Sequence, residues 1–226
     1  MFRHAIDIKG YRLALTDAEL GKVKDFYFDD SLWIVRYLVA DTSGLLPGRQ
    51  VLISPVSLNQ VDEKQKKISI NLSKEDVEFS PPIDLDKPVS RQDEKKIVNY
   101  YTWPNYWEAK AHEVSEKKDP NLRSMQEIKN YEICGTDGPV GYVKDFIIDD
   151  LDWSVSYMVV DTRKLIPGRK VLLALRWIRE IDAEEKKVVV DVACDAVRSA
   201  PEYNPETPLN REIEAGIFDH YEKEYY

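Results

Sequence analysis

The segment VADTSGLLPGRQVL (residues 39–52) returns as VVDTRKLIPGRKVL at residues 159–172, 120 positions later and without a gap. At the same offset, residues 8–101 match residues 128–221 at about 34 of 94 positions. Solenoid repeats of about 20–50 residues cannot bury a core alone, whereas a repeat of this length can. The 226-residue chain therefore predicts two complete domains of one fold.

The repeats define the predicted domain boundaries. We place the first domain at residues 1–101 and the second at residues 124–226. Between them, residues 102–123 become charged and polar after an aromatic start, which is typical of a linker.

Short strands bounded by turn residues dominate each half. Residues 21–41 carry β-branched and aromatic runs around FDDSLW, which indicates a hairpin with Asp at its turn. LPGR at 46–49 predicts the next turn, because Pro fixes φ and Gly frees it. With a strand at 11–15 and a turn at Lys66-Lys67, each half has about five or six short strands. We predict a mainly β fold of two tandem small antiparallel β-barrels, in which closure removes exposed sheet edges.

Helix signals follow each set of strands. SKEDVEF (73–79) and SRQDEKKIVNYY (90–101) begin with Ser and carry Asp three residues later, a weaker relative of the capping box. The second segment and its counterpart near the end of the chain place apolar residues on one helical face. We expect one or two short helices on the outside of each barrel.

The charge balance narrows the class of partner. A formal charge of −9 and a pI near 5.0 disfavour nucleic acid, whose binding normally rests on a dense Lys/Arg face. No run of about 18 apolar residues occurs, and the start lacks the apolar region of a signal peptide. We expect a protein partner or self-association as a homodimer, with no nucleic acid, no membrane span and a cytoplasmic location.

Histidines and cysteines give no pattern of a catalytic or metal site. Cys134 and Cys194 form no CxxC motif, and His4, His112 and His220 lack the i, i+4 spacing of a helical metal site. Motifs of the GxSxG, GxxxxGK[ST], GxGxxG and HExxH types do not occur. We therefore expect a protein that is not an enzyme, with no catalytic residue, cofactor or metal.

Two aspartate pairs, Asp29-Asp30 and Asp149-Asp150, have two interpretations. Two carboxylates held close together can share a proton or bind a hard cation. Neighbouring strand residues point to opposite faces, however, so an adjacent pair seldom converges on one point. Turn formation is the favoured interpretation.

The arginines of the two PGR turns, Arg49 and Arg169, also have two interpretations. Each can grip a carboxylate or phosphate in bidentate fashion. A local ion pair with Asp41 or Asp161, across the same loop, is favoured over an anion site.

The cluster YYTWPNYW (100–107) is the candidate interaction surface. Aromatic side chains dominate interface hot spots, although packing against the first barrel is the commoner use of such residues. The second half ends in YEKEYY, without tryptophan, so the two barrels are expected to present different surfaces. The candidate residues are Tyr100, Tyr101, Trp103, Tyr106 and Trp107.

These motifs resemble the PRC-barrel domain, known from the cytoplasmic part of the photosynthetic reaction-centre H subunit and from a ribosome-maturation factor. The resemblance rests on G-x-V-K-D-F-x-x-D-D-x-x-W at 21–33 and 141–153, on V-x-D-T, and on L-x-P-G-R-x-V-L. The resemblance extends over nearly the whole chain. Within the family, the chain is similar to a bacterial subgroup with two tandem PRC barrels. The resemblance implies a six-stranded small barrel that serves in docking and assembly, and it transfers no activity.

The leading functional hypothesis is a non-enzymatic adaptor that binds a protein partner. One alternative is an accessory role in photosynthetic or other membrane electron transfer, which rests on analogy with the H subunit alone. Another is a small-ligand binder or enzyme that uses the crevice between the barrels.

Overall fold

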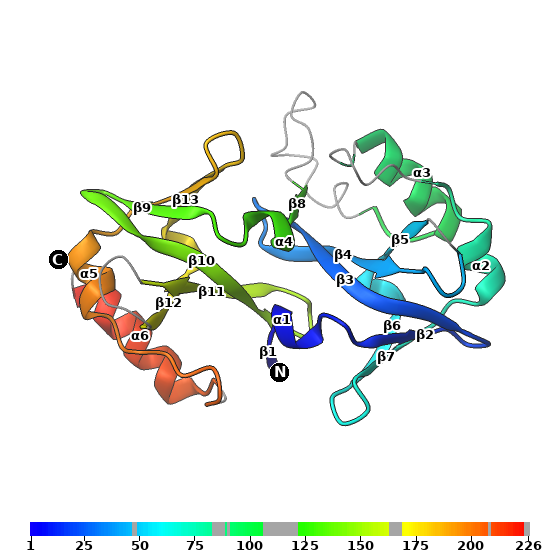
Figure 1. The fold of residues 1–226 in the computed structure, drawn as a ribbon, viewed down its shortest axis with the longest axis horizontal. Helices are drawn as coiled ribbons and strands as arrows, with labels where there is room; N and C mark the ends of the chain where they lie inside the picture. The colour runs from blue at the N-terminus through cyan, green and yellow to red at the C-terminus, as the bar shows by residue number, and fades with distance from the viewer. Residues whose placement is uncertain are drawn as a thin grey trace. The chain divides into compact units, whose positions relative to one another are not determined.

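The computed structural model describes residues 1–46, 49–82, 89, 91–105, 122–162, 169–207 and 209–223. The chain divides into two compact units (Figure 1). The N-terminal unit consists of Asp7–Ser124, and the C-terminal unit combines Met1–Ile6 with Met125–Tyr226. Each unit contains a seven-stranded sheet, so the fold is mainly β, as predicted.

The sheet of the N-terminal unit has the order β5-β4-β3-β2-β7-β6, with β8 added beside β3. Two short α-helices follow the β6–β7 hairpin. The elements are β2 Arg12–Ala14, β3 Glu19–Asp29, β4 Ile34–Asp41, β5 Gln50–Ile53, the 3-10 turn Pro55–Ser57, β6 Leu58–Asp62, β7 Lys67–Ile70, α2 Lys74–Glu78, α3 Arg91–Tyr101 and β8 Leu122–Ser124.

The sheet of the C-terminal unit repeats this order as β12-β11-β10-β9-β14-β13, with β1 added beside β10. Its elements are β1 Phe2–His4, α4 Met125–Ile128, β9 Glu132–Gly135, β10 Gly138–Asp149, β11 Val155–Asp161, β12 Lys170–Ala174, the 3-10 turn Leu175–Trp177, β13 Ile178–Asp182, β14 Lys187–Val190, α5 Cys194–Ser199 and α6 Arg211–Lys223. A further short helix, α1, spans Ala5–Ile8.

The strand pairing corrects the antiparallel prediction at one place in each sheet. β2 pairs with β7 in parallel, and β9 pairs with β14 in parallel. The long connection between these strands allows a parallel pair, whereas the short hairpins elsewhere require antiparallel ones. Among the described residues no hydrogen-bonded ladder joins β5 to β6 or β12 to β13, so hydrogen bonds do not close either sheet.

The predicted hairpin at 21–41 is present as β3 and β4. Val23, Phe26 and Phe28 of β3 are buried, and a register shift between Val23 and Asp25 accounts for the three-residue spacing of the first two. At the turn, Trp33 has φ +55° and its N–H donates to the carbonyl of Asp29 at 2.7 Å. The second repeat builds the same turn with Trp153.

The predicted helices form at the expected places. Ser73 caps α2 in a capping box with Asp76, whose backbone N–H donates to the Ser73 hydroxyl. α3 packs on β4 and β5 through Ile97, which joins Tyr37 and Leu52 in one buried cluster. No helix in the described ranges is both long and apolar enough to cross a membrane.

The compact units and the sequence repeats divide the chain differently. β1 precedes the first repeat but belongs to the unit built from the second, and β8 precedes the second repeat but belongs to the unit built from the first. The chain therefore changes unit after Ile6 and again after Ser124. The two repeats exchange their first strands.

Candidate functional site

The exchanged strands dock on the last residues of the two longest strands, β3 and β10. β2 pairs with the first part of β3, around Lys22, and β8 pairs with the last part, at Tyr27–Asp29. β9 and β1 divide β10 in the same way. We name these two places the acceptor edges: Tyr27–Asp29 on β3 and Ile147–Asp149 on β10. Each provides main-chain groups that pair with an extended segment.

The two acceptor edges hold their strands in the same register. On β10, Phe2, Arg3 and His4 lie opposite Asp149, Ile148 and Ile147. On β3, the equivalent residues Leu122, Arg123 and Ser124 lie opposite Asp29, Phe28 and Tyr27. Each pair of partners is related by the 120-residue repeat, so the two edges are equivalent sites for one kind of segment.

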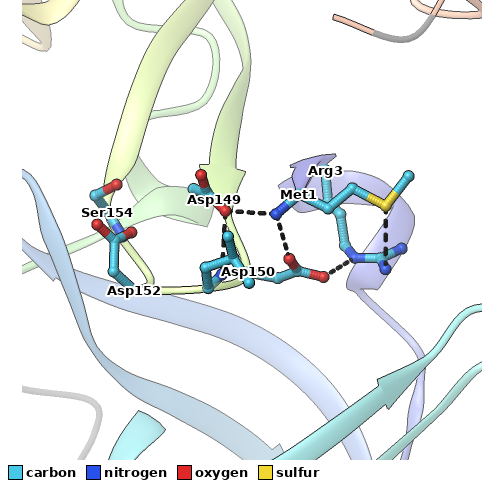
Figure 2. A network of polar contacts seen from close by, with 7 residues as sticks. Met1, Arg3, Asp149, Asp150, Asp152 and Ser154 are labelled. Carbon is cyan, nitrogen blue, oxygen red and sulfur yellow. Dashed lines mark hydrogen bonds and ion pairs between the residues drawn. The ribbon is translucent and has the colours of Figure 1, made fainter.

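The central residue of each exchanged strand is an arginine that forms an ion pair. Its partner is the second aspartate of the Asp-Asp pair, the residue that directly follows the acceptor edge. Arg3 Nε lies 2.5 Å from Asp150 Oδ2, and both side chains are largely buried (Figure 2). Arg123 Nε lies 2.8 Å from Asp30 Oδ2. The N–H groups of Arg fit a carboxylate in a fixed geometry, so this pair sets which residue occupies the central position.

The third residue of each strand makes a second polar contact. His4 Nδ1 lies 2.9 Å from Asp145 Oδ2, and His4 Nε2 lies 2.7 Å from the Tyr203 hydroxyl. In the other unit the hydroxyl of Ser124 donates to Asp25 Oδ2 at 2.5 Å. Asp25 and Asp145 belong to the repeated V-K-D-F motif, so both repeats use the same carboxylate for the same purpose.

The first residue of each strand contacts the apolar core. Leu122 packs against the cluster that contains Tyr37 and Ile97, and the ring of Phe2 meets Tyr157 edge-on at 6.4 Å. Tyr157 is the equivalent of Tyr37. The acceptor edges therefore recognise the sequence apolar–Arg–polar, FRH in one case and LRS in the other.

A family model described as PRC-barrel domain matches residues 3–77. Residues 3–77 are thus similar to the PRC-barrel domain. This confirms the predicted resemblance for the first repeat, and the second repeat forms a sheet with the same strand order. No curated protein matches the chain. The matched range begins at Arg3, so β1 belongs to the PRC-barrel motif in sequence although it docks in the other unit.

The C-terminal unit has an additional contact at its acceptor edge. The Met1 ammonium group lies 2.6 Å from both Asp149 Oδ1 and Asp150 Oδ1 (Figure 2). Burial raises the pKa of Asp150, but hydrogen bonds from this ammonium group and from Arg3 offset the effect, and the net pKa is lowered. Burial also raises the pKa of Asp30, and Arg123 offsets this only in part, so that pKa stays raised.

The predicted aromatic surface divides into buried and exposed parts. Tyr101 and Trp103 stack at 4.3 Å between ring centroids and pack against the core cluster of the N-terminal PRC-barrel unit. Burial raises the pKa of Tyr101 to about 12. Tyr100 is 40% exposed. Tyr106 and Trp107 lie outside the described residues.

The aspartate pairs have both a turn role and a binding role. Asp29 Oδ1 accepts hydrogen bonds from the backbone N–H groups of Ser31 and Leu32, as the turn interpretation predicts. Asp30 instead holds Arg123. Asp29 and Asp30 therefore have different partners, whereas Asp149 and Asp150 converge on the Met1 ammonium group, which differs from the expectation for neighbouring strand residues.

The PGR arginines do not follow the favoured prediction of a local ion pair. Arg49 Nη1 donates to the carbonyl of Glu78 at 2.8 Å, and Nη2 donates to the Ser80 hydroxyl at 2.6 Å. Arg169 likewise donates to the carbonyl of Arg198 at 2.5 Å. Carbonyls at a helix C-terminus lack partners within the helix, and a guanidinium group satisfies them. Arg49 and Arg169, which directly precede β5 and β12, thus connect these strands to helices α2 and α5.

The remaining candidates are structural in this arrangement. Desolvation by burial, with a hydrogen bond to Asp137, raises the pKa of the Cys194 thiol to about 11, so it stays protonated at neutral pH. His220 Nε2 lies 2.7 Å from the carbonyl of Ala196. The sequence indicates no site for His4, one of three histidines that lie far apart in the chain. The structure places it in the contact between β1 and β10.

Sequence reasoning missed the exchanged strands. Arg3 and Arg123 are identical residues at the 120-residue offset, but the matched region from residue 8 onward does not include them. An arginine ahead of each repeat, together with an Asp-Asp turn inside each repeat, was the available signal. It leaves open which arginine pairs with which turn.

The electrostatics of the two edges predict unequal effects of one substitution. We expect Asp150→Asn to reduce the hydrogen-exchange protection of β1 about 30-fold, equivalent to about 2 kcal/mol, because it removes a charged acceptor shared by two cations. Asp30→Asn is the matched control. It should cost less than about 1 kcal/mol at β8, since burial already disfavours the ionised form of Asp30. Equal losses at β1 and β8 would contradict this ranking.

Lowering the pH should affect strand docking at the two acceptor edges differently. Because folding lowers the pKa of Asp150, its contribution is present above the unfolded-state value near 3.8 and is lost as the pH falls through the folded-state pKa. Asp30 has the opposite sign, since its raised pKa makes protonation favour the folded state. We expect β1 to lose protection relative to β8 below about pH 4.

Proposed function

We propose that this protein is a non-enzymatic interaction module that binds a protein partner through the N-terminal PRC-barrel unit. The observation that carries the proposal is a pair of exposed rings, Phe79 at 68% exposure and Tyr100 at 40%. Phe79 is the C-cap residue of α2. The hydroxyl of Tyr100, which belongs to α3, donates to the carbonyl of Asp76 in α2 at 2.9 Å. Exposed aromatic side chains are enriched where proteins bind each other.

The second repeat supports this reading because it has the same fold without these rings. At the 120-residue offset, Phe79 and Tyr100 correspond to Ser199 and His220. The fold alone therefore does not require aromatic residues at the two positions. A feature present in one unit and absent from its equivalent favours a role outside folding.

The charges around the rings favour a partner with basic residues. α2 exposes three acidic residues beside Phe79, namely Glu75, Asp76 and Glu78, against one exposed lysine, Lys74. The whole chain has a formal charge of −9, which favours the approach of a basic surface. We infer a partner that presents an apolar patch bordered by Lys or Arg.

The non-enzymatic part of the proposal is supported by how the buried polar groups are used. His4, Asp145 and Tyr203 are linked by hydrogen bonds, an arrangement that resembles a proton relay. Two of the three belong to the docking of β1: His4 lies within the strand, and Asp145 Oδ1 also accepts the N–H of Ile6 at 3.2 Å. The arrangement therefore holds the exchanged strand.

Affinity capture from the native host tests the proposal with a matched pair of variants. Phe79→Ser with Tyr100→His installs the residues of the second repeat, which the fold accepts at the equivalent positions. Leu151→Ser is the control, because Leu151 is 84% exposed in the other unit and corresponds to Ser31. We expect wild type and the control to enrich the same protein, and the double variant to lose it at least tenfold, or about 1.4 kcal/mol. Equal capture by all three chains, or capture of nothing, would count against the proposal.

A further inference from the structure

We propose that two copies of this protein join by exchanging the strand Phe2–His4, so that β1 of each copy docks on the acceptor edge of β10 in the other. The inference goes beyond the partner binding proposed above, because it uses a different surface from Phe79 and Tyr100. Failure to capture a partner therefore leaves it intact, and its own failure leaves the partner proposal intact. The kind of partner is a second copy of this chain.

The docked strand β1 is distant in sequence from β10, the strand that accepts it. β1 pairs with β10 although the paired positions lie between 143 residues apart (His4 and Ile147) and 147 residues apart (Phe2 and Asp149), and the chain changes unit directly after Ile6. The contacts that hold it are local to the strand: the main-chain register, Arg3 to Asp150, and His4 to Asp145. A strand from a second copy makes all of these contacts without change.

Exchange of β1 between two copies leaves no acceptor edge empty. Each chain has two donor strands, β1 and β8, and two acceptor edges. When each copy gives β1 to the other and keeps β8 on its own β3, all four edges of the pair are filled. The connections then form a closed ring of four units, so the exchange stops at a dimer rather than growing into a fibre.

The free-energy difference between the monomer and the exchanged dimer is not set by the strand contacts. Monomer and exchanged dimer have the same strand contacts, and the difference between them lies in association entropy and in the segment that connects the units. The tethered strand has a high effective concentration, so dilute chains favour internal docking. Concentrated chains that refold together will form the exchanged dimer.

The experiment uses a charge exchange at the Arg3–Asp150 pair. One chain carries Arg3→Asp, which places two carboxylates at the edge, and a second chain, labelled with heavy nitrogen, carries Asp150→Arg, which places two guanidinium groups there. When the two are refolded together from urea at high concentration, exchange of β1 restores opposite charges at both edges of a mixed dimer. Native mass spectrometry distinguishes the mixed dimer from both homodimers.

We expect the mixed dimer to exceed each homodimer at least tenfold. The chain that carries both substitutions restores the pair internally and should behave as wild type, monomeric when dilute and with normal hydrogen-exchange protection of β1. Unsubstituted chains, one of them labelled, should form mixed dimers when refolded together at high concentration, which keeps the test independent of whether the single variants fold. Persistent monomers in both mixtures would overturn the proposal, and so would dimers of the charge variants in purely statistical proportions.

Discussion

Cleavage of the chain between Asn105 and Leu122 is expected to leave its two fragments bound to each other. Each fragment contains one sequence repeat, so a chain of two independent repeats would fall apart when cut. The structure instead places β1 of the first fragment in the C-terminal unit and β8 of the second fragment in the N-terminal unit. Separation requires that both sheets lose a paired strand, and the main-chain groups of β3 and β10 then lose their partners.

The measurement is size-exclusion chromatography of the full chain with a protease recognition sequence inserted after residue 113, before and after digestion. We expect the cut protein to elute as one species of unchanged size in the absence of denaturant. A second chain with Arg3→Asp and Arg123→Asp weakens both ion pairs, and its fragments should separate at a lower urea concentration. Fragments that separate spontaneously at micromolar concentration would show that the exchanged strands do not hold the units.

Much of this fold is predictable from the sequence because its signals are local. The DDxxW turns, the capping box at Ser73 and the apolar alternation of β3 each depend on residues within a few positions of one another. The 120-residue offset then transfers every local prediction to the second half. These features determine a mainly β fold with the observed hairpins.

Local sequence signals do not predict the parallel strand pairs or the strand exchange, and the reason is physical. Arg3 could form with Asp30 the ion pair that it forms with Asp150, since both edges hold their strands in the same register and both carry the same Asp-Asp pair. The arginine–aspartate pair therefore does not distinguish exchanged from unexchanged docking. The choice depends on the path of the chain through α1 and α4, which no short-range pattern encodes.

The aromatic cluster illustrates the same limit at the level of one side chain. The sequence places Tyr100, Tyr101 and Trp103 together, but it does not say which ring faces the core. A helical residue points to the core or to solvent according to its position on the face, and α3 turns Tyr101 inward and Tyr100 outward. Exposure, rather than composition, identifies Tyr100 and Phe79 as the testable pair.

The second large effect is expected from Gly21→Ala. Gly21 has φ +145°, and a Cβ at this position would lie 1.9 Å from the carbonyl oxygen of Asp41 on β4. β4 pairs with β3 at this point, since Lys22 lies opposite Asp41, so the strand cannot yield without breaking the ladder. Backbone strain and steric overlap together should cost about 4 kcal/mol, which lowers hydrogen-exchange protection of the N-terminal unit about a thousandfold.

The distribution of that loss along the chain tests the strand exchange as well as the glycine. β8 is part of the N-terminal unit, so Leu122–Ser124 should lose protection with β3, although they adjoin the second repeat. Phe2–His4 should keep their protection, because their sheet is that of β10. Gly44→Ala is the control: a Cβ there meets no heavy atom within 4 Å, and the change should stay below about 0.5 kcal/mol. Loss of protection at Phe2–His4 with β8 unaffected would mean that each strand docks within its own repeat.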